Sequence, residues 1–146
     1  MSFFNPADSI GFHCSLTFKA FRQALEKRLQ GTGISPVHVL ALAHLMALGP
    51  LSQSELGDKL FITAASTARL VDRMERDGWV ERQADPEDRR VNRLVITEKA
   101  RSMWGEISFY ARDVLEQASR GIERAEIEQA IAVLTRVRHN LENSGS

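Results

Sequence analysis

Apolar residues recur at helical spacing over most of this chain, and an alternating pattern interrupts them only between residues 79 and 96. Near the N-terminus one apolar face extends from about Asp8 to Leu29, and the glycines at positions 31 and 33 predict the end of this helix. The residues of that face are Ile10, Cys14, Phe18, Phe21, Leu25 and Leu29. Ser35 and Pro36 are typical of an N-cap and a first helical position, so a second helix should begin there.

Two short helices with clear start signals follow. Ser52 and Glu55 form a capping box, in which the hydroxyl and the carboxylate each satisfy an orphan backbone N–H. A helix should therefore begin at Gln53 and run to about Leu60, and Thr63 is a good N-cap for the next one. The inward stripe of that next helix comprises Thr67, Leu70, Val71 and Met74. Its outward face comprises Ala65, Arg69, Asp72 and Arg76, flanked by Ser66, Ala68 and Arg73.

The period changes after Gly78, which takes the left-handed conformation that ends a helix at little cost. Residues 79–83 and 91–96 alternate side chains and are rich in β-branched or aromatic residues, as paired strands require. Pro86, directly after Asp85, predicts a turn between them because its ring presets φ. Together these elements predict a β-hairpin.

The C-terminal part has the strongest helical pattern. Thr97 caps a helix whose apolar stripe lasts about five turns, until Gly121 breaks it. That stripe comprises Ala100, Met103, Trp104, Ile107, Ala111, Val114, Leu115 and Ala118. A last amphipathic helix has Ile127, Ile131, Leu134, Val137 and Leu141 on one side. These stripes and the N-terminal one exceed what a small core can cover, so we expect them to pack against another subunit.

The run from Asp85 to Thr97 resembles the wing signature of the MarR family of bacterial transcription regulators. The run from Arg69 to Val80 resembles that family's recognition helix and first wing strand. The resemblance extends over most of the chain, since the long helices on both sides are the family's arrangement. It implies a homodimer that binds a pseudopalindromic DNA operator, and many members are released by small phenolic ligands or by thiol oxidation.

The predicted fold class is accordingly mostly α with a small β-hairpin, a winged helix-turn-helix with long N- and C-terminal dimerisation helices. We call the winged helix-turn-helix part of the chain the reading head, and we expect residues 1–50 to form N-terminal helices that support this part and contribute to dimerisation. Residues 51–97 should be the DNA-binding region, and residues 98–146 the C-terminal dimerisation helices.

Charge qualifies this picture, because the net charge is zero although DNA affinity comes from Lys and Arg on phosphates. Residues 51–97 carry eight basic against nine acidic residues. The positions of the arginines nevertheless favour DNA binding, since they gather on the outer face of the predicted recognition helix and on the wing.

The predicted DNA contacts are Ser52, Gln53, Thr63, Ala64, Ala65, Ser66, Ala68, Arg69, Arg73, Arg76, Asp88, Arg89 and Arg90. In the resembled family the Asp-x-Arg pair, here Asp88 and Arg90, fixes the wing so that an arginine enters the minor groove, which suits arginine's attraction to narrow grooves.

Cys14 is the only cysteine, so no disulfide forms within the chain. Peroxide-sensing relatives carry a reactive cysteine in this region, and a thiolate near a helix N-terminus is activated. Those relatives use tyrosines beside the thiolate, whereas Tyr110 lies in a different predicted helix. This favours a buried cysteine that acts as a small hydrophobe.

An effector pocket is supported by the resemblance and by local composition where the first two helices should meet. Its candidate residues are Phe12, His13, Cys14, Thr17 and His38. Ordinary core packing explains the same residues about as well. His38 and His44 lie six apart, which is not the spacing of a zinc pair, so we expect neither a metal nor another cofactor.

The leading hypothesis is a DNA-binding regulator, most simply a repressor released by a small organic effector, with no catalytic activity. No Lys or Arg precedes Lys19, and the apolar stretch 37–48 is too short for a bilayer, so we expect a cytoplasmic protein. The alternatives are an oxidant-sensing regulator that uses Cys14, a thiol-dependent enzyme at the same residue, and a helical dimerisation or adaptor protein that has lost DNA binding.

Overall fold

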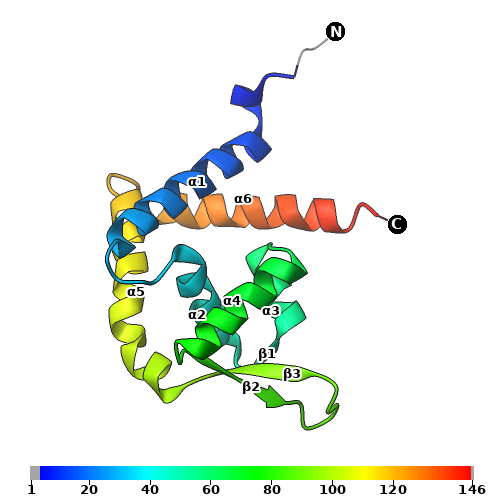
Figure 1. The fold of residues 1–146 in the computed structure, drawn as a ribbon. Coiled ribbons are helices and arrows are strands. Elements are labelled where there is room, and N and C mark those ends of the chain that lie inside the picture. Colours follow the sequence, from blue (N-terminus) through cyan, green and yellow to red (C-terminus); the bar gives the residue numbers. More distant parts are fainter. Residues whose placement is uncertain (1–3, 146) are drawn as a thin grey trace. The chain divides into compact units, whose positions relative to one another are not determined.

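The computed structural model describes residues 4–145 and confirms the predicted fold class. Figure 1 shows a mostly helical chain with one small antiparallel sheet. In chain order the elements are η1 (Pro6–Asp8), α1 (Ile10–Leu29), α2 (Pro36–Leu48), β1 (Leu51–Ser52), α3 (Gln53–Leu60), α4 (Ala64–Arg76), β2 (Val80–Ala84), β3 (Asn92–Ile96), α5 (Glu98–Ala118) and α6 (Arg124–Glu142). The chain divides into two compact units, Met1–Arg112 and Asp113–Ser146.

The predicted start signals of α3 and α4 are confirmed. The Ser52 backbone N–H donates to Glu55 Oε2 at 2.9 Å, and the Glu55 N–H donates to Ser52 Oγ at 3.1 Å. Thr63 Oγ1 accepts from the Ser66 N–H at 3.1 Å. Gly78 has φ +80°, as the end of α4 requires. Both helices of the reading head therefore begin where local capping chemistry places them.

The first helix begins later than predicted. Asp8 belongs to the short helix η1, and α1 starts at Ile10 because the Ser9 side chain accepts from the Phe12 N–H and caps the helix there. At its other end α1 stops at Leu29, as the glycines indicated.

The sheet has the order β1-β3-β2, and all neighbours are antiparallel. The hairpin strands pair from Val80 opposite Ile96 to Ala84 opposite Asn92, each beginning one residue later than predicted. The two-residue strand β1, which pairs Leu51 with Leu94, was not predicted, since two residues cannot show an alternating pattern. This sheet joins the wing to the helices of the reading head.

The core of the reading head lies between α2, α3, α4 and the sheet, which contact one another. The predicted inward stripe of α4 is confirmed, because all four of its residues are buried. The side chains that are almost completely buried include Leu42, Leu56, Val71, Met74, Val80 and Leu94. Since helices and wing share this core, the recognition helix and the hairpin have a defined mutual position.

A close approach at Gly57 holds α3 against α4. A Cβ built at this position would lie 2.5 Å from Thr67 Oγ1. Thr67 cannot yield easily, since it is buried and its hydroxyl donates to the Thr63 carbonyl at 2.8 Å. Only glycine fits here, so the tight packing of the two helices depends on it.

We therefore expect Gly57→Ala to lower the free energy of unfolding by about 1–3 kcal/mol, since the overpacking outweighs alanine's higher helix propensity. Denaturant unfolding followed by circular dichroism measures the change. Gly105→Ala in α5 is the matched control, because apart from its two chain neighbours and the backbone of its own helix no atom lies within 4 Å of its Cβ position, and it should be neutral or stabilising. Equal stabilities for wild type and Gly57→Ala would contradict this packing argument.

The long helices leave much of their apolar surface uncovered. On α1, Leu25 and Leu29 are buried, whereas Ile10, Cys14 and Phe18 are exposed. On α5, Ala100, Ile107 and Val114 are buried. The stripe of α6 has no buried residue, and its Ile131 and Leu141 are 57% and 74% exposed. None of the helices described for residues 4–145 is both long and apolar enough to span a bilayer.

Candidate nucleic-acid interface

The outer face of α4 is the centre of the candidate interface. Arg69, Arg73 and Arg76 are exposed opposite the buried stripe. Arg69 Nη2 donates to Ser66 Oγ at 3.3 Å, and Arg76 Nε lies 3.9 Å from Asp77 Oδ1. The exposed N-terminal residues of this helix are Thr63, Ala64 and Ala65, with Ser66 and Ala68 half-buried beside them. Small residues at the helix start and arginines along it would let this helix enter a DNA groove closely.

At the start of α3, Ser52 and Gln53 are both half-buried. The Ser52 hydroxyl is engaged in its capping box, and Gln53 Oε1 accepts a hydrogen bond from Arg82 Nη2 at 3.1 Å. The Gln53 amide nitrogen carries the donors that remain for a ligand.

The tip of the wing contains the Asp-x-Arg pair in contact. Arg90 donates to Asp88 from its backbone N–H at 3.0 Å, from Nε at 3.1 Å and from Nη2 at 3.2 Å. These hydrogen bonds lower the pKa of the Asp88 carboxyl. The Arg90 side chain is nevertheless 90% exposed, and Arg89 beside it is exposed as well. The pair thus braces the turn while leaving two guanidinium groups at its surface.

The base of the wing contains an ion pair that the sequence interpretation missed. The sequence pattern predicts only a turn at Asp85, but in the structure Asp85 is buried and accepts from the Glu87 N–H at 2.8 Å and from Arg93 Nε at 2.6 Å. These hydrogen bonds hold the pKa of Asp85 below its ordinary value. Arg93 Nη1 also donates to the Pro50 carbonyl at 3.3 Å. The hairpin is therefore attached to the segment that precedes α3.

Arg82 on β2 was also missed. Its guanidinium donates to Asp72 Oδ1 at 2.6 Å and to Glu75 Oε1 at 2.9 Å, in addition to Gln53. Burial alone would lower the pKa of Arg82, but the hydrogen bonds to the two carboxylates outweigh it and raise the pKa. Asp72 is exposed, as predicted, yet its charge is paired.

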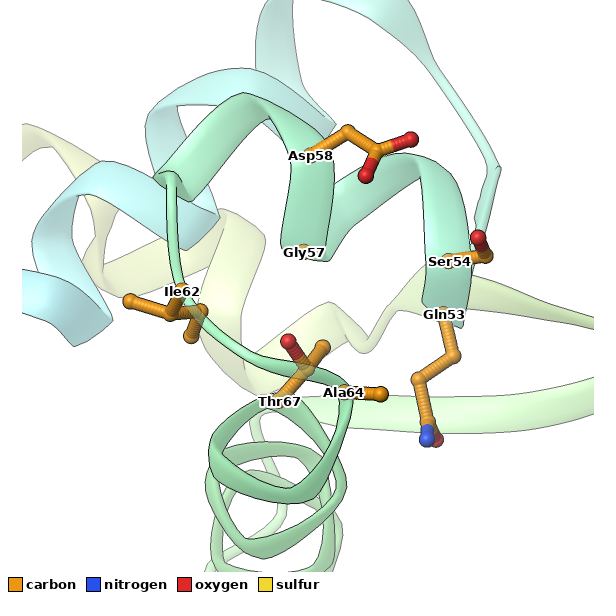
Figure 2. Close-up of a pocket in the computed structure, with 7 residues that line it drawn as sticks. All are labelled: Gln53, Ser54, Gly57, Asp58, Ile62, Ala64 and Thr67. Carbon is orange, nitrogen blue, oxygen red and sulfur yellow. The ribbon is translucent and has the colours of Figure 1, made fainter.

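A small pocket of about 170 Å³ lies between α3 and α4 (Figure 2). Its lining residues are Gln53, Ser54, Gly57, Asp58, Ile62, Ala64 and Thr67. Two of the predicted DNA contacts line this pocket, and Figure 2 shows Gln53 on α3 and Ala64 at the start of α4. The volume lies below the usual range for organic ligands, about 300–1,000 Å³.

The candidate effector residues lie in two different environments. His38 is buried in the first turn of α2, where its Nδ1 meets Ser35 Oγ at 2.5 Å as part of the helix cap. Burial lowers the pKa of His38, and the nearby charge of Arg73 lowers it further. Phe12, His13, Cys14 and Thr17 are exposed on the N-terminal half of α1.

The prediction that Cys14 is buried is therefore wrong within one chain. An apolar helix face predicts that the face is buried, but it does not tell whether the same chain or a partner subunit buries it. The effector pocket as a whole stays a prediction.

Comparison with known proteins agrees with this geometry. The sequence model of the MarR family matches residues 32–91. The crystal structure of the transcriptional regulator PA3341 is 34% identical, with 92% of this chain and 99% of that chain covered and a TM-score of 0.85. Two less similar structures share the fold. The repressor CouR, bound to a 23-mer DNA duplex, is 17% identical with 94% and 99% covered and a TM-score of 0.78. BpsR of Bordetella bronchiseptica, whose DNA binding is regulated by 6-hydroxynicotinic acid, is 15% identical with 94% and 98% covered and a TM-score of 0.80.

The fold and its exposed basic helix thus define a winged helix-turn-helix regulator. The chain belongs to the MarR family. It is a DNA-binding transcription regulator and not an enzyme, which removes the thiol-dependent enzyme and the adaptor from consideration.

Proposed function

We propose that the protein is a homodimeric repressor that binds a pseudopalindromic operator and is released by a small organic effector. The observation that carries this proposal is the exposed arginine face of α4 next to a wing braced at its tip and its base. One such surface reads one half-site, and two-fold symmetry would present it twice. In the proposed division of labour, residues 51–97 contact DNA, and residues 1–50 and 98–146 build the dimer.

Two neighbours support the finer points of the proposal. CouR is a repressor on a DNA duplex, and BpsR has its DNA binding regulated by 6-hydroxynicotinic acid, an aromatic acid. For this chain the proposed contacts are those named from the sequence, from Ser52 to Arg90. The proposed effector is a small phenolic or other organic molecule, and its proposed site is formed by the candidate residues Phe12, His13, Cys14, Thr17 and His38.

A gel-shift assay on the intergenic DNA beside the protein's own gene tests operator binding. A parallel selection from a random-sequence duplex library supplies a ligand that does not depend on gene order. We expect a shifted band that excess unrelated DNA does not compete away, and enriched sequences with two related half-sites. Enrichment of no sequence by the selection would contradict operator-specific binding.

Oxidant sensing is the second candidate, and the exposure of Cys14 is the observation that favours it. We nevertheless expect Cys14→Ser to bind the selected duplex as wild type does, both before and after treatment with peroxide. The reason is that Cys14 shares an uncovered apolar face with Ile10 and Phe18, which a partner subunit would cover, and that no second cysteine within the same chain can resolve a sulfenic acid. Peroxide release of wild type but not of Cys14→Ser, seen by gel shift, would instead establish a sensor.

A further inference from the structure

The recognition helix α4 carries acidic as well as basic side chains, and Arg82 on β2 pairs with the acidic ones. Within α4, three arginines are accompanied by two acidic residues, Asp72 and Glu75. Asp72 lies three residues after Arg69 and four before Arg76, so at 100° per residue it occupies the same outer face. Its side chain is 70% exposed. A free carboxylate there would face the phosphates of any DNA that the arginines contact.

Arg82 reaches this face from a different element. Its Nη2 contacts Asp72 and Gln53, its Nη1 contacts Glu75, and its backbone N–H donates to Glu75 Oε2 at 3.0 Å. One guanidinium thereby connects β2 with the start of α3 and with two successive turns of α4. Only 24% of the Arg82 side chain is exposed, compared with 90% for Arg90. Such a group is placed to hold other side chains, and less well placed to touch DNA itself.

We propose that Arg82 is a positioning residue of the DNA-reading surface, which neutralises Asp72 and Glu75 and holds them and Gln53 in place beside the arginines. This inference rests on the proposed operator binding and adds a residue that acts through others. Loss of Arg82 releases two carboxylates per chain toward the DNA backbone. The resulting repulsion is electrostatic, so added salt should screen it.

The test uses full-length protein and the duplex that wild type selects from a random library, with affinity measured by fluorescence anisotropy at low and at high salt. We expect Arg82→Gln to weaken binding by about tenfold or more at low salt, and by clearly less at high salt. The triple variant Asp72→Asn, Glu75→Gln, Arg82→Gln carries no exposed carboxylate at these positions. It should recover to within about threefold of wild type.

Arg120→Gln is the matched control, since this exposed arginine lies after α5 and outside the candidate interface, and its affinity should not change. Circular dichroism melting confirms that every variant is folded at the assay temperature. A merely structural role of Arg82 would give a loss that does not depend on salt and that the triple variant does not repair, and this result would overturn the proposal. The same holds for a direct phosphate contact, which the triple variant could not replace.

Unchanged binding by Arg82→Gln, with wild type bound tightly, would overturn the role of Arg82 alone. A wild-type protein that selects no duplex would overturn the proposed function, and the role of Arg82 with it.

Discussion

Leu134→Glu and Leu141→Glu should each convert the protein to a monomer and abolish operator binding. Both residues lie on the apolar side of α6, where Leu134 is half-buried and Leu141 is 74% exposed within one chain. A carboxylate in a subunit interface costs several kcal/mol when nothing pairs with it. Operator binding should fall by more than about a hundredfold, because one chain can engage only one half-site. Light scattering at micromolar concentration gives the mass, and gel shift gives the affinity.

Ala132→Glu is the matched control for these variants. Two residues before Leu134, it lies about 160° around the helix and is exposed. It should remain dimeric and bind normally. Wild-type protein that is itself monomeric at micromolar concentration would contradict the expectation of a dimer.

Arg69→Ala and Arg90→Ala should both weaken operator binding, but through different contributions. Arg69 is exposed on the outer face of α4, and in the proposed complex it would contact a guanine edge, so its loss should cost about 1–3 kcal/mol per half-site and relax specificity at one position. Arg90, at the braced tip of the wing, should contact phosphates and the minor groove. Its loss should reduce the salt dependence by about one unit per half-site and leave most base preferences in place.

Affinities on a panel of single-base operator variants at several salt concentrations separate the two effects. Arg120→Ala, an exposed arginine far along the sequence from both sites, should change neither. Equal losses on every duplex for both variants, with no change of base preference, would contradict the assignment of Arg69 to base readout.

The reading head could be predicted from the sequence because its signals are local. Capping boxes act over three residues, so Ser52 and Thr63 placed the starts of α3 and α4 correctly. The helical period then separated the buried stripe around Val71 from the outer arginines. The change of period after Gly78 indicated the hairpin to within one residue at each strand start.

The missed residues depend on contacts between elements. Arg82 lies ten residues after Asp72 and 29 after Gln53, and only the packing of β2 on α4 brings their side chains together. Asp85 and Arg93 meet because the hairpin folds back on itself. No periodicity reports such pairs. The one available hint was that two acidic residues, Asp72 and Glu75, stand among the arginines of α4 and that an arginine lies on the strand that follows.

The sequence also could not predict which apolar helix faces are covered within the chain itself. An amphipathic face predicts burial, but its partner can be the same chain or a second one. Leu25 on α1 is covered within the chain, whereas Cys14 and Phe18 on the same predicted face are exposed. His38 illustrates a related ambiguity, because a polar residue in an apolar helix can line a ligand site or, as here, cap its own helix.

Two copies of this chain should bind one operator together. The most direct test is a light-scattering titration of the selected duplex with wild-type protein, which gives the mass of the complex at each ratio. We predict two chains per duplex and no complex of one chain with one duplex, even when DNA is in excess. A stable complex that contains a single chain, or no complex at all, would show that the protein does not bind its operator as a dimer.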